Sequence, residues 1–356
     1  MKIKFSIVGK EINYKYLFSR QDEYNAEIVD EQQRNTFALS EIQTDTPIIS
    51  EYLVKENKLR VLYPDNKKFA VCLTHDIDVL FFSKKEIIKQ VIKKNIGVSY
   101  NKPLPGLYSL IDKRKSPLFN VRQIVEIEKK YNANSTFFFL ALKKNERDFN
   151  YKIYEIEDVF KIIKDNNSEI GLHAGHHAYN DLNKLKEEKN SLENCVKAKI
   201  IGIRNHFLKF STPQTWEIQS FAGFKYDTSY GYNDAAGFRN GLCHPFSPFN
   251  SSSNKYVDIM EIPLTLMDCT LDRYMRLDIN NSWKYIKKFI DKVEQVGGIF
   301  NLLWHNSYFF EGNLELYVKI LDYCQSKGAW LTSGENIYKW WAENNIKTKF
   351  YEELNL

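Results

Sequence analysis

Two carboxylates and three imidazoles stand where apolar segments of the chain end, in positions where they could bind a metal ion and activate water. Asp76 and Asp78 follow one such segment in the motif THDID, His173 and His177 belong to the motif HAGHH after another, and His305 ends a third. Imidazole nitrogens and a carboxylate oxygen are ligands of Zn²⁺ and similar ions, and three protein ligands leave a position open for water. The residue types therefore indicate a hydrolytic metal site.

Neither motif decides the chemistry alone. His173 and His177 are four residues apart, so a single helical turn would bring both imidazoles to one face. HAGHH is also compatible with a loop whose histidines make ordinary hydrogen bonds. Asp76 and Asp78 could simply cap a following helix, although two neighbouring carboxylates repel each other unless a cation or a base compensates.

The elements that must position these residues alternate along the chain. Short segments rich in Val, Ile, Phe and Leu predict buried parallel strands at 69–74, 135–142, 169–173, 199–204, 257–264 and 299–305. Charged segments with helical spacing predict helices at 84–95, 121–131, 156–165, 182–198, 282–296 and 313–327. Repeated beta-alpha units of this kind predict an α/β barrel, whose active site lies at the carboxyl ends of the strands.

Composition sets the limits of this interpretation. The 356 residues are 43% hydrophobic and 27% charged, with a formal net charge of +5, which excludes disordered and fibrous classes and does not imply nucleic-acid binding. The five cysteines form no CxxC pair, so we expect free thiols. We see no signal peptide and no run of the ~20 apolar residues that a membrane span needs, so we expect a cytoplasmic protein.

Three regions are expected. Residues 1–66 predict a strand-rich or irregular N-terminal extension, residues 67–345 a catalytic barrel, and residues 346–356 a C-terminal tail. Within the barrel, the stretch 205–256 is rich in Gly, Asn, Ser, Pro and aromatic residues, which is typical of long functional loops.

In order along the chain, the motifs THDID, HAGHH, IRNHF, KYDTS, EIPL and LLWH resemble those of the polysaccharide deacetylase family, also called the NodB-homology or carbohydrate esterase family 4. The resemblance runs from about Phe69 to Trp341. It implies a distorted (β/α) barrel and a divalent ion, Zn²⁺ first and Co²⁺, Ni²⁺, Mn²⁺ or Fe²⁺ as alternatives. The implied ligands are Asp78, His173 and His177.

The resemblance also implies roles around the ion. Asp76 would be the general base, and Arg204 would orient it and keep it ionised. Phe207 replaces the family's tyrosine, whose backbone N–H helps to bind the oxyanion, and His206 replaces a proline.

His305 would be the general acid for the leaving amine, with Asp227 fixing its tautomer and raising its pKa. Trp304, beside it, is the candidate for a wall of the substrate cleft. The remaining histidines, His75, His176 and His244, are not required by the motif set.

Together these features predict a metal-dependent hydrolase that removes an N-acyl group, taken to be acetyl, from an amino sugar or glycan precursor. Two alternatives stay open, namely a hydrolase of another non-peptide C–N bond and a carbohydrate-binding domain without activity. A glycosidase with two carboxylates would leave the strand-end histidines without a role. We expect a carbohydrate or small N-acylated substrate and no nucleic-acid partner, and the sequence does not address the oligomeric state.

Overall fold

A parallel sheet of nine strands forms the centre of the protein in the computed structural model, which describes residues 13–24, 29–40, 42–82, 111–309 and 313–354 together with Ile87 and Ser109. The strand order is β8-β5-β4-β3-β2-β1-β10-β9, and β11 also pairs with β1. The strands are β1 (Phe69–Ile77), β2 (Thr136–Leu140), β3 (Glu169–Ala174), β4 (Gly202–Asn205), β5 (Tyr226–Asp227), β8 (Met260–Glu261), β9 (Leu266–Met267), β10 (Ile299–Leu303) and β11 (Ala329–Thr332).

Strand β1 organises the sheet because it has neighbours along its whole length. It pairs with β10 on one edge, and its first residues pair with β11 while its last residues, Thr74 to Ile77, pair with β2. All nine of its residues are buried, as expected for a strand with both faces covered. The polar end of β1 therefore emerges between the ends of its neighbours, where it can contribute to a site.

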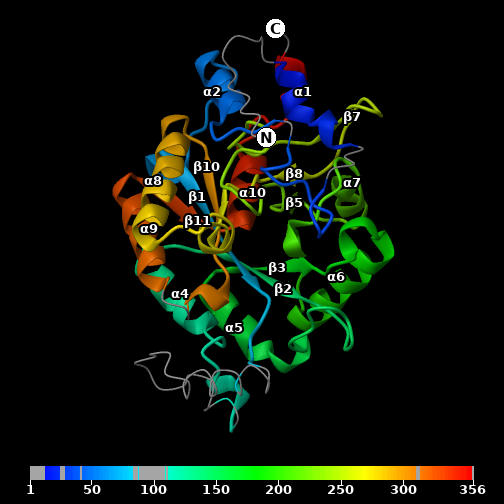
Figure 1. Cartoon of the computed structure of the whole chain (residues 1–356), viewed down its shortest axis with the longest axis vertical. Helices are drawn as coiled ribbons and strands as arrows, with labels where there is room; N and C mark the ends of the chain where they lie inside the picture. Colours follow the sequence, from blue (N-terminus) through cyan, green and yellow to red (C-terminus); the bar gives the residue numbers. More distant parts are fainter. Residues whose placement is uncertain are drawn as a thin grey trace.

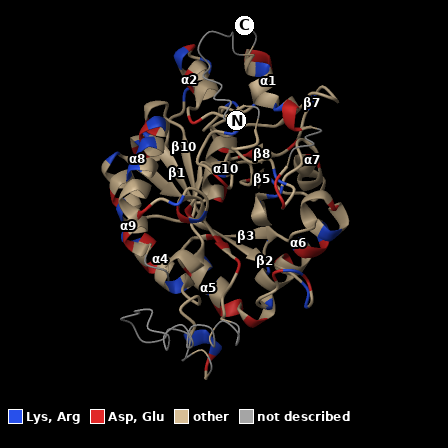
Figure 2. Cartoon of the chain, in the orientation of Figure 1, with Lys and Arg blue, Asp and Glu red and all other residues tan. Residues whose placement is uncertain are grey.

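Helices surround this sheet (Figure 1). They are α4 (Val121–Lys129), α5 (Glu157–Asp165), α6 (Leu182–Val196), α7 (Gln214–Phe221), α8 (Ile279–Gln295), α9 (Leu314–Ser326) and α10 (Gly334–Glu343). Most of them bury apolar residues, as α5 does with Val159, Phe160 and Ile163, and charged residues of both signs lie along the outer helices (Figure 2). This arrangement confirms the predicted distorted barrel. None of the described helices is both long and apolar enough to cross a bilayer.

The N-terminal extension differs from its prediction. Its described residues form the helices α1 (Tyr14–Ser19) and α2 (Ile48–Lys55) and two short 3-10 turns, with no strand among them, so the strand-rich alternative is wrong for this part of the chain. The reason is visible in α2, where Ile49 and Leu53 are four residues apart and are both fully buried.

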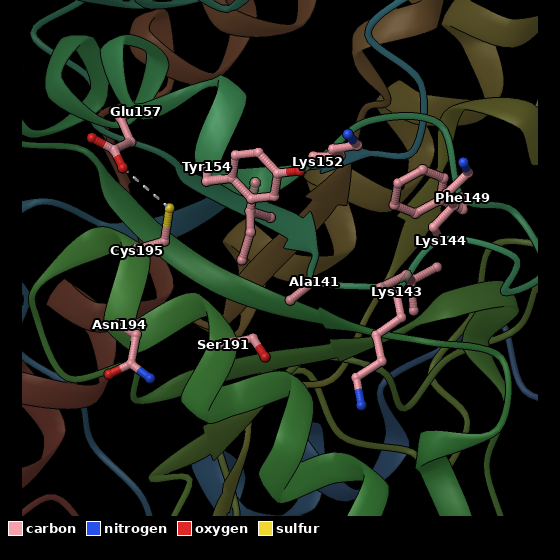
Figure 3. A pocket seen from close by; sticks show the side chains of 12 residues that line it. Ala141, Lys143, Lys144, Phe149, Lys152, Tyr154, Glu157, Ser191, Asn194 and Cys195 are labelled. Carbon is pink, nitrogen blue, oxygen red and sulfur yellow. Dashed lines mark hydrogen bonds between the residues drawn. The ribbon is translucent and has the colours of Figure 1, made fainter.

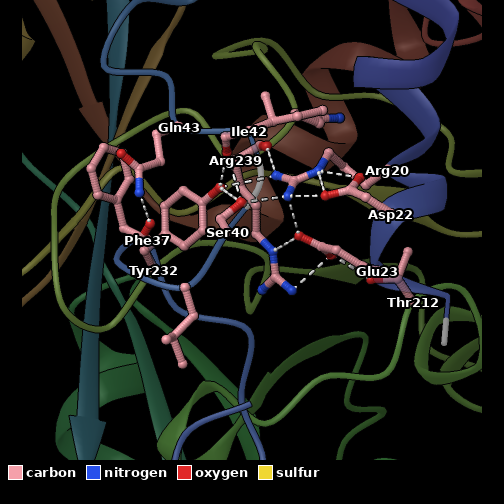
Figure 4. Close-up of polar contacts among 12 residues, drawn as sticks. Arg20, Asp22, Glu23, Phe37, Ser40, Ile42, Gln43, Thr212, Tyr232 and Arg239 are labelled. Carbon is pink, nitrogen blue, oxygen red and sulfur yellow. Dashed lines mark hydrogen bonds and ion pairs between the residues drawn. The ribbon is translucent and has the colours of Figure 1, made fainter. Parts of the chain in front are cut away.

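A buried ion-pair cluster ties this extension to the barrel (Figure 4). Glu23 accepts two hydrogen bonds from Arg239, at 2.9 and 2.8 Å, and lies 2.9 Å from the Arg20 guanidinium. Burial would raise the pKa of Glu23, but Arg20 and Arg239 lower it to about 2. Buried ion pairs therefore connect the N-terminal extension to the loop after β5.

The remaining segments refine the sequence-based expectations. The stretch expected as long loops contains α7, β5 and a small hairpin of β6 (Phe249–Asn250) and β7 (Lys255–Tyr256). The predicted C-terminal tail forms a 3-10 turn at Tyr351–Leu354, where the Tyr351 ring lies 6.2 Å from that of Phe18 in α1. The helix predicted at 84–95 falls almost entirely outside the described residues.

Candidate active site

The carboxylate of Asp76, in the last part of β1, lies beside Arg204 of β4. Asp76 is 2% exposed, and its Oδ1 is 4.0 Å from Arg204 Nη1. Two hydroxyls hold the guanidinium in place, because Arg204 donates to Thr228 Oγ1 at 2.9 Å and to Thr74 Oγ1 at 3.0 Å. The expected proximity of Arg204 and Asp76 is therefore present.

Three imidazoles surround Asp78, just after β1. The Nε2 atom of His173 lies 3.1 Å from Asp78 Oδ1, that of His206 lies 3.6 Å from the same oxygen, and that of His305 lies 3.6 Å from Oδ2. Burial alone would raise the pKa of Asp78, but His206, His173 and His305 lower it well below its usual range. Asp78 is thus the centre of the cluster.

Asp78, His173 and His206 fit a divalent metal ion. Their ligand atoms all lie within 4.8 Å of one another, and two nitrogens with one carboxylate oxygen suit Zn²⁺ and similar ions. Asp78 Oδ1 and His173 Nε2 are buried and make no hydrogen bond within the described part of the chain, although buried polar atoms are normally paired. An ion bound between them would satisfy both atoms.

Both histidines present a ring nitrogen for such a role, although for His173 burial is outweighed by Asp76 and Asp78, which raise its pKa. His173 Nδ1 lies 3.0 Å from the carbonyl oxygen of Arg204, which assigns the proton to Nδ1 and leaves the Nε2 lone pair toward Asp78. Burial outweighs the attraction of Asp78 and lowers the pKa of His206 to about 4, so this imidazole is neutral near pH 7. Neutral imidazole is the form that binds metal.

His177, the third ligand expected from the sequence, does not join this group. After β3 the chain enters a 3-10 turn at Ala178–Asn180 rather than an α-helical turn, and His177 precedes it with an exposed side chain. Its ring packs at 4.8 Å from that of His176 instead. His206 takes its place in the group, a residue that the sequence marked only as the substitute for a proline. The signal that could have found it is its position one residue after strand β4.

A strained turn directs His206 toward the cluster. Phe207 and Leu208 have φ of 61° and 53°, a left-handed conformation that is unfavourable for residues other than glycine. Arg34 of the N-terminal extension donates to the Phe207 carbonyl at 3.1 Å, and Asn205 donates to the Lys209 carbonyl at 3.0 Å. The extension therefore helps to hold the turn that supplies His206.

His305, after β10, is paired with Asp268. Its Nδ1 lies 2.7 Å from Asp268 Oδ1, and its backbone N–H donates to Oδ2 at 2.5 Å. Burial would lower the pKa of His305, but Asp268, followed by Asp78 and Asp76, raises it to about 10. The ring is thus oriented with Nε2 toward Asp78 and holds a proton that it can donate.

Asp227, the partner expected for His305, has another role. It accepts hydrogen bonds from Gln219 and from the amide and hydroxyl of Ser229, at 2.6 to 3.0 Å, and burial raises its pKa. The strand order explains the difference, since β5 lies beyond β4 whereas β9, which precedes Asp268, pairs directly with β10. The assignment of Asp227 to His305 is therefore wrong.

The expectation for Trp304 changes as well. Trp304 is 1% exposed and packs with its ring 5.5 Å from that of Tyr317, so it belongs to the core and does not line a cleft. His75 and His244 are fully buried and hydrogen-bonded, the first to Glu128 and the second to Ser50. Neither of these two histidines reaches the cluster around Asp78.

A cavity of about 480 Å³ lies away from this cluster, on the flank of the barrel (Figure 3). It is bordered by the segment after β2 and by α6, and the Cys195 thiol lies 3.9 Å from Glu157 at its edge. Asp78 and the three imidazoles around it are not among its lining residues. The cavity is therefore separate from the candidate active site.

Comparisons with known proteins agree with this architecture. No family model matches the chain, and no curated protein sequence matches it. A solved structure from Mycobacterium smegmatis named as a polysaccharide deacetylase superposes with a TM-score of 0.56 at 15% identity, covering 81% of this chain and 95% of the other. The chain has the polysaccharide deacetylase fold. The structure of Puue allantoinase is similar to this fold too, with a TM-score of 0.54 and 15% identity over 90% of this chain and 100% of the other.

On this deacetylase fold, most of the sequence-predicted residues meet at one end of the sheet. The residues that the structure brings together are Asp76, Asp78, His173, Arg204 and His305. His206 and Asp268 join them, while His177, Asp227 and Trp304 lie elsewhere. Phe207, expected as the oxyanion donor, lies next to His206 with its ring 4.2 Å away.

Proposed function

We propose that the protein is a metal-dependent hydrolase that removes an N-acyl group, taken to be acetyl, from an amino sugar or a glycan precursor. One observation carries the proposal. The Asp78 carboxylate lies 3.1 and 3.6 Å from the imidazoles of His173 and His206, with the buried Asp76 carboxylate and a third imidazole, that of His305, beside them. This combination provides ligands, a base and an acid for hydrolysis of an amide.

Asp78, His173 and His206 would hold the ion. When bound, a divalent ion supplies Lewis acidity and lowers the pKa of water to near 7. Zn²⁺ is the first candidate because of the two nitrogens and one oxygen, and Co²⁺, Ni²⁺, Mn²⁺ or Fe²⁺ accept the same donors.

The chain's own residues would move the protons. Asp76 accepts the proton of the attacking water, and the Arg204 guanidinium, whose Nη1 lies 4.0 Å from Asp76 Oδ1, orients the carboxylate. His305 donates a proton from Nε2 to the leaving nitrogen, because Asp268 holds Nδ1 at 2.7 Å and stabilises the charged ring. The Phe207 N–H, at the strained turn, is the proposed oxyanion donor.

Hydrolysis of another non-peptide C–N bond is the second candidate. It is favoured by the similarity to the allantoinase structure, at a TM-score of 0.54. The two candidates place the same demands on Asp76 and His305 and differ only in the acyl and amine groups. A panel of N-acetylated amino sugars and cyclic amides, allantoin included, separates them. A domain that only binds carbohydrate would bind the sugars of the panel and would hydrolyse no member of it.

Substitution of the base tests the proposal. We expect Asp76→Asn to fold and retain its metal but to lose about 10²- to 10⁴-fold in kcat, because the water proton no longer has an acceptor. The assay is acetate release from N-acetylglucosamine oligosaccharides by protein loaded with Zn²⁺ or Co²⁺. Asp165→Asn, at the exposed end of α5, is the matched control. Retention of full activity by Asp76→Asn would contradict the assignment.

A further inference from the structure

Three nitrogen-bearing side chains meet beside the proposed ligands. Arg147 comes from the segment after β2, His176 from the loop after β3, and Lys209 from the segment after β4. His176 Nε2 lies 3.2 Å from Arg147 Nη1 and 3.4 Å from Lys209 Nζ. Two cationic groups therefore converge on one imidazole nitrogen.

In this contact two donors share one acceptor, although Arg147 also reaches Asp148 and Gln32. Burial, reinforced by Lys209, Arg147 and His177, lowers the pKa of His176 to about 4, so the ring is neutral near pH 7. A neutral imidazole offers one acceptor lone pair, which two donors cannot both use fully. His176 Nδ1, moreover, is buried without a hydrogen-bond partner among the described residues.

Lys209 is the most unusual member of the cluster. It is only 4% exposed, its pKa is lowered by burial and by Arg147 and Arg34, and its Nζ takes part in no ion pair among the described residues. Its ammonium faces the Tyr179 ring at 4.7 Å instead. Buried lysines are normally paired with an acid, because desolvation of an isolated charge is costly. The surroundings of Lys209 would therefore favour a bound anion.

The nearest acids are already engaged. Asp30 pairs with Arg34 at 2.7 Å, and Asp148 lies 3.4 Å from Arg147 Nε. Arg34 donates to Asp30 and to the Phe207 carbonyl, so these donors are already used. The Arg147 side chain is 48% exposed, which connects the cluster to solvent.

The cluster also lies close to the proposed metal. The Phe207 ring separates the two, with its centroid 4.2 Å from that of His206 and 5.6 Å from that of His176. The Arg147 guanidinium covers the same ring at 5.3 Å. The cluster and the proposed ligands therefore share the Phe207 ring as a neighbour.

We propose that Arg147, His176 and Lys209 form a binding site for an anionic group of the substrate, a phosphate or a carboxylate. This inference rests on the proposed function, because it adds to it the class of substrate: an N-acylated sugar that is phosphorylated or acidic. A guanidinium and an ammonium are the groups that proteins use for such anions.

Binding of simple anions to metal-free protein tests the site without the reaction. Inorganic phosphate is titrated into chelator-treated protein by calorimetry, and glucuronate is titrated in a parallel experiment. We expect Lys209→Met and Arg147→Met to weaken binding at least about tenfold, since each removes a charge-assisted hydrogen bond. Lys199→Met, whose side chain is 88% exposed, is the control for loss of one charge and should bind as the wild type does.

The ligand variant His206→Ala separates this proposal from the proposed function. It should lose the metal and keep anion binding, whereas Lys209→Met should lose anion binding and keep the metal. Tighter binding of phosphate would indicate a phosphorylated sugar, and tighter binding of glucuronate an acidic one. If neither anion binds the metal-free protein, or if both bind Lys209→Met and Arg147→Met as well as the wild type, the anion site is wrong. Absence of metal or turnover with anion binding intact would overturn only the hydrolase proposal.

Discussion

Two imidazole–carboxylate pairs lie on neighbouring strands and have opposite characters. His75, in β1, lies 2.8 Å from Glu128, and His305, after β10, lies 2.7 Å from Asp268. The second nitrogen of His75 is bonded to a backbone carbonyl at 2.8 Å, and its side chain is 0% exposed. The second nitrogen of His305 faces Asp78 at 3.6 Å, and its side chain is 14% exposed.

The difference shows that a carboxylate partner alone does not identify a histidine as catalytic. Glu128 also accepts hydrogen bonds from Tyr317 and Ser135, both at 2.6 Å, so the pair with His75 is a closed polar network that stabilises the fold. His305 keeps its Nε2 atom 3.6 Å from Asp78 and without a hydrogen-bonded partner of this kind among the described residues. In the proposed mechanism, the free nitrogen rather than the carboxylate partner distinguishes His305 from His75.

The largest effect is expected for the pair of His305 and Asp268. His305→Gln should lower kcat/KM about 10³-fold, because it removes the proton donor for the leaving nitrogen while retaining a polar side chain of similar size. Metal content and thermal unfolding should stay close to wild type. Kinetics of acetate release together with calorimetry check this, and a variant that is active but unstable would show that His305 is structural.

For the pair of His75 and Glu128 we expect a loss of stability rather than a loss of activity. Glu128→Gln should lower the free energy of unfolding by about 3 kcal/mol, since it leaves buried partners without their charged acceptor. Activity per folded molecule should show no comparable loss. Urea unfolding gives the stability, and activity measured well below the unfolding transition gives the second quantity. A catalytic loss with unchanged stability would remove the distinction between the pairs.

A smaller effect is expected at the carboxylate that orients His305. Asp268→Asn should reduce kcat about tenfold to a hundredfold, as loss of a partner that orients a functional histidine typically does. Asp227→Asn is the matched comparison, because Asp227 is equally buried but bonds to Gln219 and Ser229. Should Asp227→Asn prove the more damaging of the two for kcat, the assignment of Asp268 would fail.

The sequence predicted the frame of the fold because buried parallel strands are continuous apolar segments. The segment from Phe69 to Thr74 is apolar up to its last residue, and β1 begins at Phe69 as expected and continues to Ile77. Strands of two residues, such as β5 and β9, are too short to leave a pattern. Helix α7 has no clear sequence signal, because it lies among aromatic and glycine-rich residues that are typical of loops.

The length of the strands also explains which site residues the sequence predicts. Asp76, Asp78, His173 and His305 end strands with clear patterns, and the ends of parallel strands meet at one edge. The choice of His206 over His177 depends on a 3-10 turn after β3 and on a left-handed turn at Phe207, neither of which residue spacing predicts. Likewise, the partner of His305 follows from the order of the strands in the sheet.

The metal content of three proteins tests the central claim most directly. Wild type, His206→Ala and His177→Ala would be purified without chelator, soaked with Zn²⁺, desalted and measured by elemental analysis. Because three protein ligands define the site, we expect about one divalent ion per chain in the wild type and in His177→Ala, and loss of the ion in His206→Ala. Loss of the ion in His177→Ala with retention in His206→Ala would contradict the site described here.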